Sequence, residues 1–261
     1  TDSNCGIMPA EGPEYGIHVL PMPIIIDGKT YFEGVDITPE DFYSRQISGA
    51  SITTSQPSPG DVTAMWDTLL QSFDEIVFIP MSSGLSNTCQ TALLLAEDEP
   101  YRGRVFVVDN HRISVTQAMS VLDAKALAAE GKNGAQIKEI LEREALDASI
   151  YIAVDTLEYL KKGGRITAAA AAIGTLLKLK PVLTIQGDKL DSFAKARGMK
   201  SAFKIMLEAL NNDINSRLSH LRDQGLLKVG LANTVMEPDK LDAFKEELAR
   251  NFPDMELRLE A

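Results

Sequence analysis

The sequence predicts an α/β protein with two domains. Short apolar runs rich in β-branched residues alternate with helical segments through the first half of the chain, which is typical of βαβ units on a parallel sheet. This pattern changes near residue 150, and 261 residues with 44% hydrophobic content can build a large core. We therefore expect an N-terminal α/β/α domain over residues 1–149 with a mostly parallel sheet, and a C-terminal α/β domain over residues 150–261 with a mixed sheet.

Local signals place the elements of the first half. Strands over residues 18–26 and 29–32 flank Asp27-Gly28, a two-residue turn that predicts a hairpin. Thr38-Pro39 followed by two acidic residues predicts the start of a helix. Apolar spacing predicts another helix that begins at Ser58 or Pro59. The remaining predictions are strands over 75–80 and 104–109, and helices over 89–96, 115–131 and 134–145.

The second half is expected to contain strands over 150–154 and 227–232, a strand and a tight turn into the next strand over 181–190, and helices over 156–162, 166–178, 200–210 and 240–251. Gly163-Gly164 separates the first two of these helices. The helix over 166–178 includes five consecutive alanines, which would let a thin ligand or another backbone approach closely. A plain helix packed against a sheet explains the same run, because alanine is the best helix former.

Composition excludes several classes of function. A net charge of −11 argues against nucleic acid, whose binding requires cationic side chains, and against attraction to anionic membranes. The sequence has no apolar run of the ~20 residues that span a bilayer, and it does not begin like a secretory signal. Cys5 and Cys89 lack metal-ligand spacing and do not form a disulfide scaffold, so we expect no metal site and a reducing, cytoplasmic location.

Two segments rich in small hydroxyl residues, 53–60 and 82–88, precede helical segments. Hydroxyls and free backbone N–H groups at a helix start can hold an anion. The second segment also follows a predicted buried strand, and ligands of open α/β sheets bind outside the carboxyl ends of strands. Ordinary helix capping by serine and threonine is the alternative for either segment alone.

Four motifs occur in one order along the chain. They are Thr-Ser-Gln-Pro-Ser-Pro (54–59), Ser-Ser-Gly-Leu-Ser-x-Thr (82–88), Val-Asp-Thr-Leu-Glu-Tyr-Leu-Lys-Lys-Gly-Gly-Arg-Ile (154–166) and Leu-Lys-Pro-Val-Leu (179–183). With Thr1-Asp2-Ser3 and residues 20–31, the sequence resembles the DegV family over nearly its whole length. The resemblance implies a two-domain protein that binds a long-chain fatty acid between its domains. It also implies that the chain is a carrier without catalytic residues or cofactor, whose possible partner is the separate kinase subunit of a bacterial fatty acid kinase.

A buried carboxylate needs hydrogen-bond donors, and the two hydroxyl-rich segments provide them. Thr54 and Ser83 are the first choices. Further candidates are the hydroxyls of Ser82 and Ser86 and the N–H groups of Gly84 and Leu85. Burial of an acyl chain contributes ~0.8 kcal/mol per methylene, or roughly 11 kcal/mol for about fourteen methylenes before the costs of association. Ile166, Ile173 and Leu177 are expected to line that chain.

Other polar residues suggest supporting roles. Lys161, Arg165 and Arg197 are candidates for docking an acidic partner or the phosphate chemistry of the kinase, and solvated surface charge is the alternative. Asp2 and Asp155, near strand ends, could orient the hydroxyl-rich segments or act in turns and caps. His111 follows Asp109-Asn110, and a surface loop histidine is the preferred interpretation.

The family pattern includes a short apolar strand before the Asp-Ser and a late strand and loop with a histidine and Gly-Pro-Gly. The sequence from Thr1 to Ala261 contains neither, and His18, His111 and His220 do not match that histidine. A truncated sequence and a molecule that lacks these parts both remain open. In the second case the head-group site would lack one of its usual partners.

Two other classes of function remain as alternatives. A stand-alone hydrolase or transferase would use Ser83 as nucleophile, but the loop is not a Gly-x-Ser-x-Gly elbow and no histidine is evidently placed to serve it. Phosphotransfer of the dihydroxyacetone-kinase type would need a histidine carrier, and the sequence has no P-loop for ATP. The lipid-carrier hypothesis is favoured because the motifs supply donors without a general base.

Overall fold

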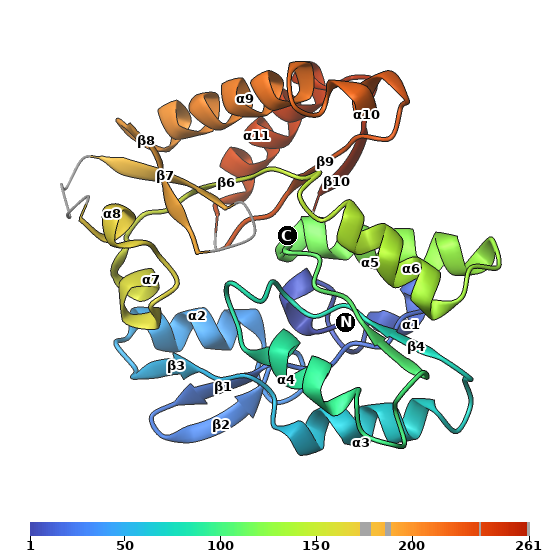
Figure 1. The fold of residues 1–261 in the computed structure, drawn as a ribbon. Helices are drawn as coiled ribbons and strands as arrows, with labels where there is room; N and C mark the ends of the chain where they lie inside the picture. Colours follow the sequence, from blue (N-terminus) through green and yellow to red (C-terminus); the bar gives the residue numbers. More distant parts are fainter. Residues whose placement is uncertain (173–178, 186–188, 235, 260–261) are drawn as a thin grey trace. The chain divides into compact units, whose positions relative to one another are not determined.

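The fold in the computed structural model is α/β, as predicted, with both parallel and antiparallel strand pairs. The structure describes residues 1–172, 179–185, 189–234 and 236–259. The chain divides into two compact units, Thr1–Leu146 and Asp147–Ala261 (Figure 1).

The first unit begins with the predicted hairpin and continues with alternating strands and helices. Its elements are η1 (Ser3–Cys5), α1 (Gly12–Tyr15), β1 (Pro23–Ile26), β2 (Lys29–Phe32), α2 (Pro39–Ile47), β3 (Ile52–Thr54), α3 (Pro59–Leu69), β4 (Ile76–Phe78), α4 (Thr88–Leu95), β5 (Val105–Val107), α5 (Ser114–Ala129) and α6 (Gly134–Arg143). Asp27 and Gly28 have φ angles of 50° and 81°, as a tight turn between antiparallel strands requires. Thr38 and Ser58 cap α2 and α3 with their side chains, as expected.

Strand pairing in this unit differs in part from the expectation of a mostly parallel sheet. Among the described strands, β4 and β5 pair in parallel, whereas β2, β1 and β3 form an antiparallel sheet in that order. The two-residue turn between β1 and β2 allows no other direction, because a parallel connection needs a crossover of a dozen or more residues. Strand β3 is only three residues long and was not predicted from the sequence.

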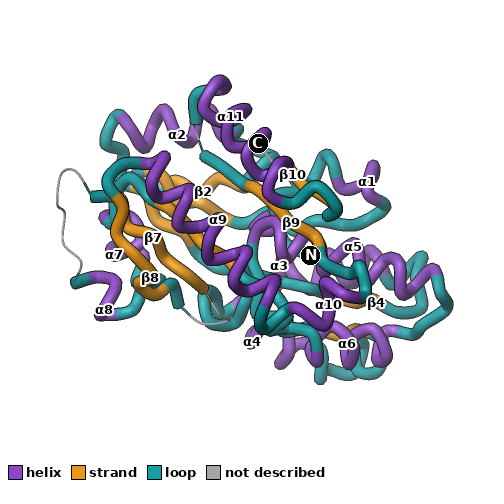
Figure 2. Tube along the Cα trace, turned by 90° about the horizontal axis from the view of Figure 1, so that it is seen from above, coloured by secondary structure: helices purple, strands orange, loops and turns teal. Residues whose placement is uncertain are grey.

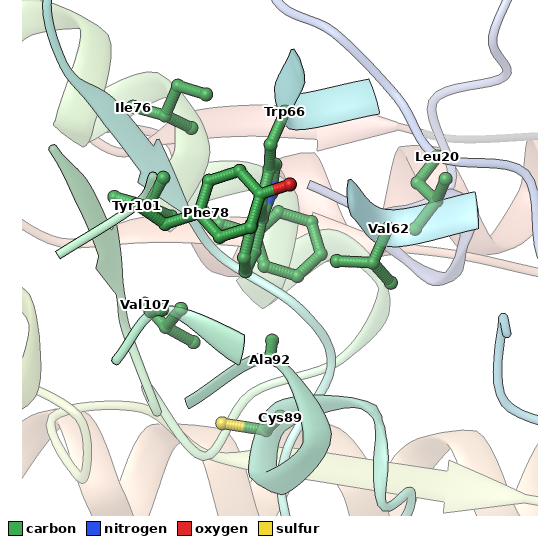
Figure 3. Packing of buried hydrophobic residues seen from close by; sticks show 11 residues of the cluster. Leu20, Val62, Trp66, Ile76, Phe78, Cys89, Ala92, Tyr101 and Val107 are labelled. Atoms are coloured by element: carbon green, nitrogen blue, oxygen red, sulfur yellow. The ribbon is translucent and has the colours of Figure 1, made fainter. Parts of the chain in front are cut away.

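Helices cover both faces of the β4–β5 pair, which gives the predicted α/β/α layers. On one face, α3 and α4 pack around Trp66, whose ring meets Phe78 and Tyr101 edge to face at centroid distances of 5.7 and 5.2 Å (Figure 3). On the other face, α5 and α6 bury Ile79 and Val108. This packing holds β4 in the middle of the layers and exposes its carboxyl end to the loop that follows.

The second unit contains two small sheets. Its elements are β6 (Ile150–Ala153), α7 (Glu158–Gly163), α8 (Ala168–Ala171), β7 (Lys180–Ile185), β8 (Asp191–Ala196), α9 (Met199–Asn215), α10 (Ser219–Asp223), β9 (Lys228–Leu231), α11 (Pro238–Asn251) and β10 (Glu256–Leu259). Strands β6, β7 and β8 are antiparallel, and α9 runs along one face of this sheet (Figure 2). Strands β9 and β10 pair in parallel.

The alanine-rich segment differs from the predicted helix over 166–178. In the described part of the chain it forms α8, which covers only Ala168–Ala171 and is capped by Thr167. Ile166 precedes this helix and forms a parallel β-bridge with Leu190. Residues 173–178 lie outside the described residues. No helix among the described residues has the length and apolar content of a membrane span.

Candidate functional site

Both hydroxyl-rich segments belong to the first unit, and a hydrogen bond connects them. Thr54 is the last residue of β3, and the loop of residues 82–87 joins β4 to α4. Gln56 Nε2 donates to Thr91 Oγ1 at 3.2 Å, so the segment after β3 is tied to the helix that the serine loop introduces. The fold therefore associates the two segments that the sequence singled out.

The start of the serine loop is held by groups from other parts of the chain. Three successive amides donate outward: Met81 N to Asp2 Oδ2 at 2.9 Å, Ser82 N to Arg112 O at 2.9 Å, and Ser83 N to Asp109 Oδ1 at 3.3 Å. A loop whose amides are bonded in this way has little backbone freedom, so the Cβ atoms of its residues are held in place.

The next three amides bond within the loop. Gly84 N donates to Ser82 Oγ at 3.2 Å, and the N–H groups of Leu85 and Ser86 donate to Ser82 O at 3.0 and 3.2 Å. In this structure the N–H groups of Gly84 and Leu85 therefore have acceptors inside the loop, and their role as donors to a ligand stays a prediction. A loop that turns back on itself uses its own carbonyls and hydroxyls as acceptors, because half-buried amides need partners.

The serine and threonine hydroxyls divide into two groups. Ser82 is fully buried and its Oγ accepts from Gly84, while Ser86 Oγ lies 2.9 Å from Thr88 Oγ1 and accepts from Thr88 N. These two side chains support the loop as caps do. By contrast, neither Ser83 Oγ nor Thr54 Oγ1 has a hydrogen-bond partner in the described part of the chain. Ser83 is half-buried and Thr54 is exposed in this unit.

The buried carboxylate of Asp2 anchors the end of β4. Its Oδ1 accepts from Asn4 N at 3.1 Å and from Gln117 Nε2 at 3.0 Å, in addition to the bond from Met81 N to Oδ2. Gln117 is also fully buried and contacts Ile79 O at 3.3 Å. Gln117 was not among the candidates predicted from the sequence. The signal that could have found it is a polar side chain on the apolar face of a long helix.

Asp109 brings His111 close to the serine loop. Its Oδ1 accepts from Ser83 N and lies 3.8 Å from His111 Nδ1, which is too long for a hydrogen bond. His111 is half-buried and has a φ of 54°, the left-handed region that non-glycine residues seldom adopt. In the described residues no hydrogen bond joins His111 to the Ser83 hydroxyl, so the serine–histidine pair of a hydrolase is not formed.

The residues predicted to line the acyl chain are only partly described. Ile166 is buried in the second unit, at 8% exposure, where its backbone pairs with Leu190. Ile173 and Leu177 lie outside the described residues. The role of these three residues stays a prediction.

The predicted docking residues also lie in the second unit. Lys161 and Arg197 are exposed, and Arg165 is half-buried with Nη1 2.5 Å from Gly163 O. Asp155, which we considered for orienting the hydroxyl-rich segments, pairs with Lys180 at 2.5 Å within this unit. This pairing gives Asp155 a partner within its own unit, whereas Asp2 contacts the start of the serine loop through Met81 N.

The histidine, cysteine and acidic side chains are the groups that could take part in metal or thiol chemistry. No cluster of three or more such side chains in the described residues is arranged as metal ligands. Cys5 and Cys89 are buried free thiols, and burial raises the pKa of Cys89 to about 12. A thiol with this pKa is protonated at neutral pH and is a poor nucleophile or ligand.

Comparison with known proteins identifies the family. The model described as "Uncharacterised protein, DegV family" matches residues 1–260. A DegV domain-containing protein of Deinococcus radiodurans is 30% identical over 98% of this chain and 88% of its own length. Among solved structures, a DegV family protein from Thermus thermophilus, described by its fatty acid binding, is 32% identical in sequence. It superposes with a TM-score of 0.81 over 99% of this chain and 90% of that one. The structure of DegV, a fatty acid binding protein from Bacillus subtilis, is 28% identical with a TM-score of 0.82, over 99% and 89%. The chain belongs to the DegV family.

Proposed function

We propose that this protein binds a long-chain fatty acid and that the hydroxyls of Thr54 and Ser83 hold its carboxylate. The observation that carries the proposal is the division among the loop hydroxyls. Ser82 and Ser86 are engaged in the loop itself, whereas the hydroxyls of Thr54 and Ser83 have no partner in the described residues. The description of the Thermus thermophilus and Bacillus subtilis relatives as fatty-acid-binding proteins supports the same ligand.

The chemistry of the head group fits these donors. An ionised carboxylate only accepts hydrogen bonds, and each hydroxyl can donate one. The loop amides already have protein acceptors, so the hydroxyls are the donors that the loop can offer. Two hydroxyl bonds confer position more than affinity. The affinity comes mainly from the acyl chain, at ~0.8 kcal/mol per buried methylene.

We further propose that this protein is a carrier of the fatty acid. The protein presents the bound carboxylate to a separate kinase subunit in the cytoplasm and requires no cofactor of its own. Two features support this role: no general base is hydrogen-bonded to the Ser83 hydroxyl in the described residues, and the exposed cations Lys161 and Arg197 are available to an acidic partner or a phosphate. Ile166, Ile173 and Leu177 remain proposed contacts of the acyl chain.

Mass spectrometry of the protein purified without added lipid tests the ligand. We expect one fatty acid per chain, both in the solvent extract and in the native mass of the intact protein. The double variant Thr54→Val, Ser83→Ala should lose it, because both carboxylate donors are removed.

Matched controls separate this loss from damage to the fold. Thr53→Val changes the neighbouring exposed threonine of β3, and Ser86→Ala removes a hydroxyl engaged inside the loop. Both controls should retain the fatty acid. A wild-type protein that carries no fatty acid and takes up none when it is added would overturn the proposal.

A further inference from the structure

The most unusual polar group of the first unit is the carboxylate of Asp2. It is fully buried, with 0% exposure, and forms no ion pair with a lysine, arginine or histidine of the described residues. All its contacts are hydrogen bonds from uncharged donors: Asn4 N (3.1 Å), Asn4 Nδ2 (3.2 Å), Gln117 Nε2 (3.0 Å) and Met81 N (2.9 Å). Burial of a carboxylate whose hydrogen bonds all come from uncharged donors is costly, so these bonds must offset that cost.

The bond to Met81 N reaches a point that the serine loop cannot secure by itself. Residue 80 is proline, which has no N–H to donate, so Met81 carries the first amide after Ile79. Side chains also hold the segment from the carbonyl side, because Thr1 Oγ1 donates to Ile79 O at 2.7 Å and Gln117 Nε2 lies 3.3 Å from the same oxygen. The chain between β4 and Ser82 is thus held at both ends by one buried network.

From Met81 the constraint passes directly to Ser83. Asp2 fixes the amide of Met81, the Arg112 carbonyl fixes that of Ser82, and Asp109 fixes that of Ser83. Three successive fixed amides leave few positions for the Ser83 Cβ and hence for its hydroxyl. Pre-organised donors bind better than mobile ones because the cost of ordering them is met during folding.

We propose that Asp2 is a positioning residue, whose buried carboxylate sets the place of the Ser83 hydroxyl by holding the Met81 amide. This inference rests on the proposed function, in which that hydroxyl binds a carboxylate. Asp2 does not contact the ligand in this scheme. It acts through the backbone of residues 81–83.

The test is a double-mutant cycle on fatty-acid affinity. Asp2→Asn keeps the shape of the side chain but turns an NH₂ group toward either Met81 N or Gln117 Nε2, both of which are donors. We expect the dissociation constant for palmitate to rise at least tenfold. Ser83→Ala should cost much less in the Asp2→Asn background than in the wild type, because the hydroxyl is already misplaced.

The matched cycle uses Thr54→Val, whose hydroxyl lies on β3 and not on the loop that Asp2 holds. Asp2→Asn and Thr54→Val should combine additively. Two results would overturn the positioning role. Additivity of Asp2→Asn with Ser83→Ala would mean that Asp2 does not act on the Ser83 hydroxyl. Equal coupling of Asp2→Asn to Ser83→Ala and to Thr54→Val would indicate a general loss of stability, which affects both hydroxyls alike. If Asp2→Asn does not fold, Gln117→Met removes the second anchor of the same carboxylate and should give the same pattern with a smaller effect.

Amide hydrogen exchange without any lipid separates this inference from the proposed function. The amides of Met81, Ser82 and Ser83 should exchange at least tenfold faster in Asp2→Asn, while Gly134, whose amide donates to Glu75 Oε2 at 2.7 Å, should be unchanged. Unchanged exchange at residues 81–83 would refute the role of Asp2. A wild-type protein that binds no fatty acid would instead refute the proposed function.

Discussion

Replacement by alanine should affect a different property at each of the adjacent residues Ser82 and Ser83. Ser82 is fully buried and its Oγ accepts the hydrogen bond of Gly84 N at 3.2 Å. Ser83 is half-buried, and its hydroxyl has no partner in the described residues. Ser82→Ala should therefore lower the free energy of unfolding and Ser83→Ala should lower ligand affinity.

The magnitude follows from the lost bond. A buried N–H without an acceptor costs about 1–3 kcal/mol. Gly84 is half-buried, so water replaces part of the lost bond, and we expect the lower end of this range, about 1 kcal/mol. For a chain of this size that corresponds to a decrease in Tm of about 2–4 °C. Ser83→Ala should stay within about 0.5 kcal/mol of the wild type, as substitutions at positions without such contacts do.

Two measurements on each variant check this prediction: urea unfolding of the ligand-free protein, and titration with palmitate. Ser83→Ala should weaken palmitate binding with little change in the urea midpoint, and Ser82→Ala should lower the midpoint. The reasoning fails if Ser83→Ala destabilises the protein as much as Ser82→Ala does. It also fails if Ser82→Ala leaves stability unchanged.

Two further predictions concern the first unit. A methyl group at Gly134 would lie 2.2 Å from Phe106 Cδ2, so Gly134→Ala should destabilise the protein by about 1–3 kcal/mol. At Gly60 the nearest atom to an added methyl group is 3.7 Å away, so Gly60→Ala should stabilise the protein by about 0.5–1 kcal/mol. Urea unfolding that ranks the two variants in the reverse order would contradict this prediction. Burial raises the pKa of Glu33, although the hydrogen bond from Ser3 Oγ at 2.5 Å acts in the opposite direction. Ionisation of Glu33 therefore destabilises the folded protein, and the free energy of unfolding falls as pH rises from the ordinary glutamate pKa through the raised value. Glu33→Gln keeps an acceptor for Ser3 Oγ but removes the charge. In urea unfolding this variant should be more stable than the wild type at pH 7 but not below about pH 4. An equal gain in stability at both pH values would argue against a buried charge.

Features that depend on neighbouring residues could be predicted from the sequence. The Asp27-Gly28 hairpin and the helix starts at Thr38 and Ser58 were confirmed, because turns and caps close their hydrogen bonds within three or four residues. The α/β class also followed from local periodicity. The strands β3 (Ile-Thr-Thr) and β10 (Glu-Leu-Arg-Leu) were not predicted. Unlike the equally short but wholly apolar β4 and β5, they carry polar side chains, and they exist through their pairing partners.

Which groups of the serine loop have no protein partner, and can therefore bond a ligand, depends on the tertiary structure. From the sequence, Ser83 was a first choice as donor, and the hydroxyl of Ser82 and the amide of Gly84 were further candidates in the same loop. The structure engages two of them inside the loop and leaves the hydroxyl of Ser83 without a protein partner in the described residues. The groups that orient the loop come from distant positions, since Asp2 is 79 residues from Met81 in the chain. Hydrogen bonds of this range form only when the chain has folded, and no local pattern encodes them.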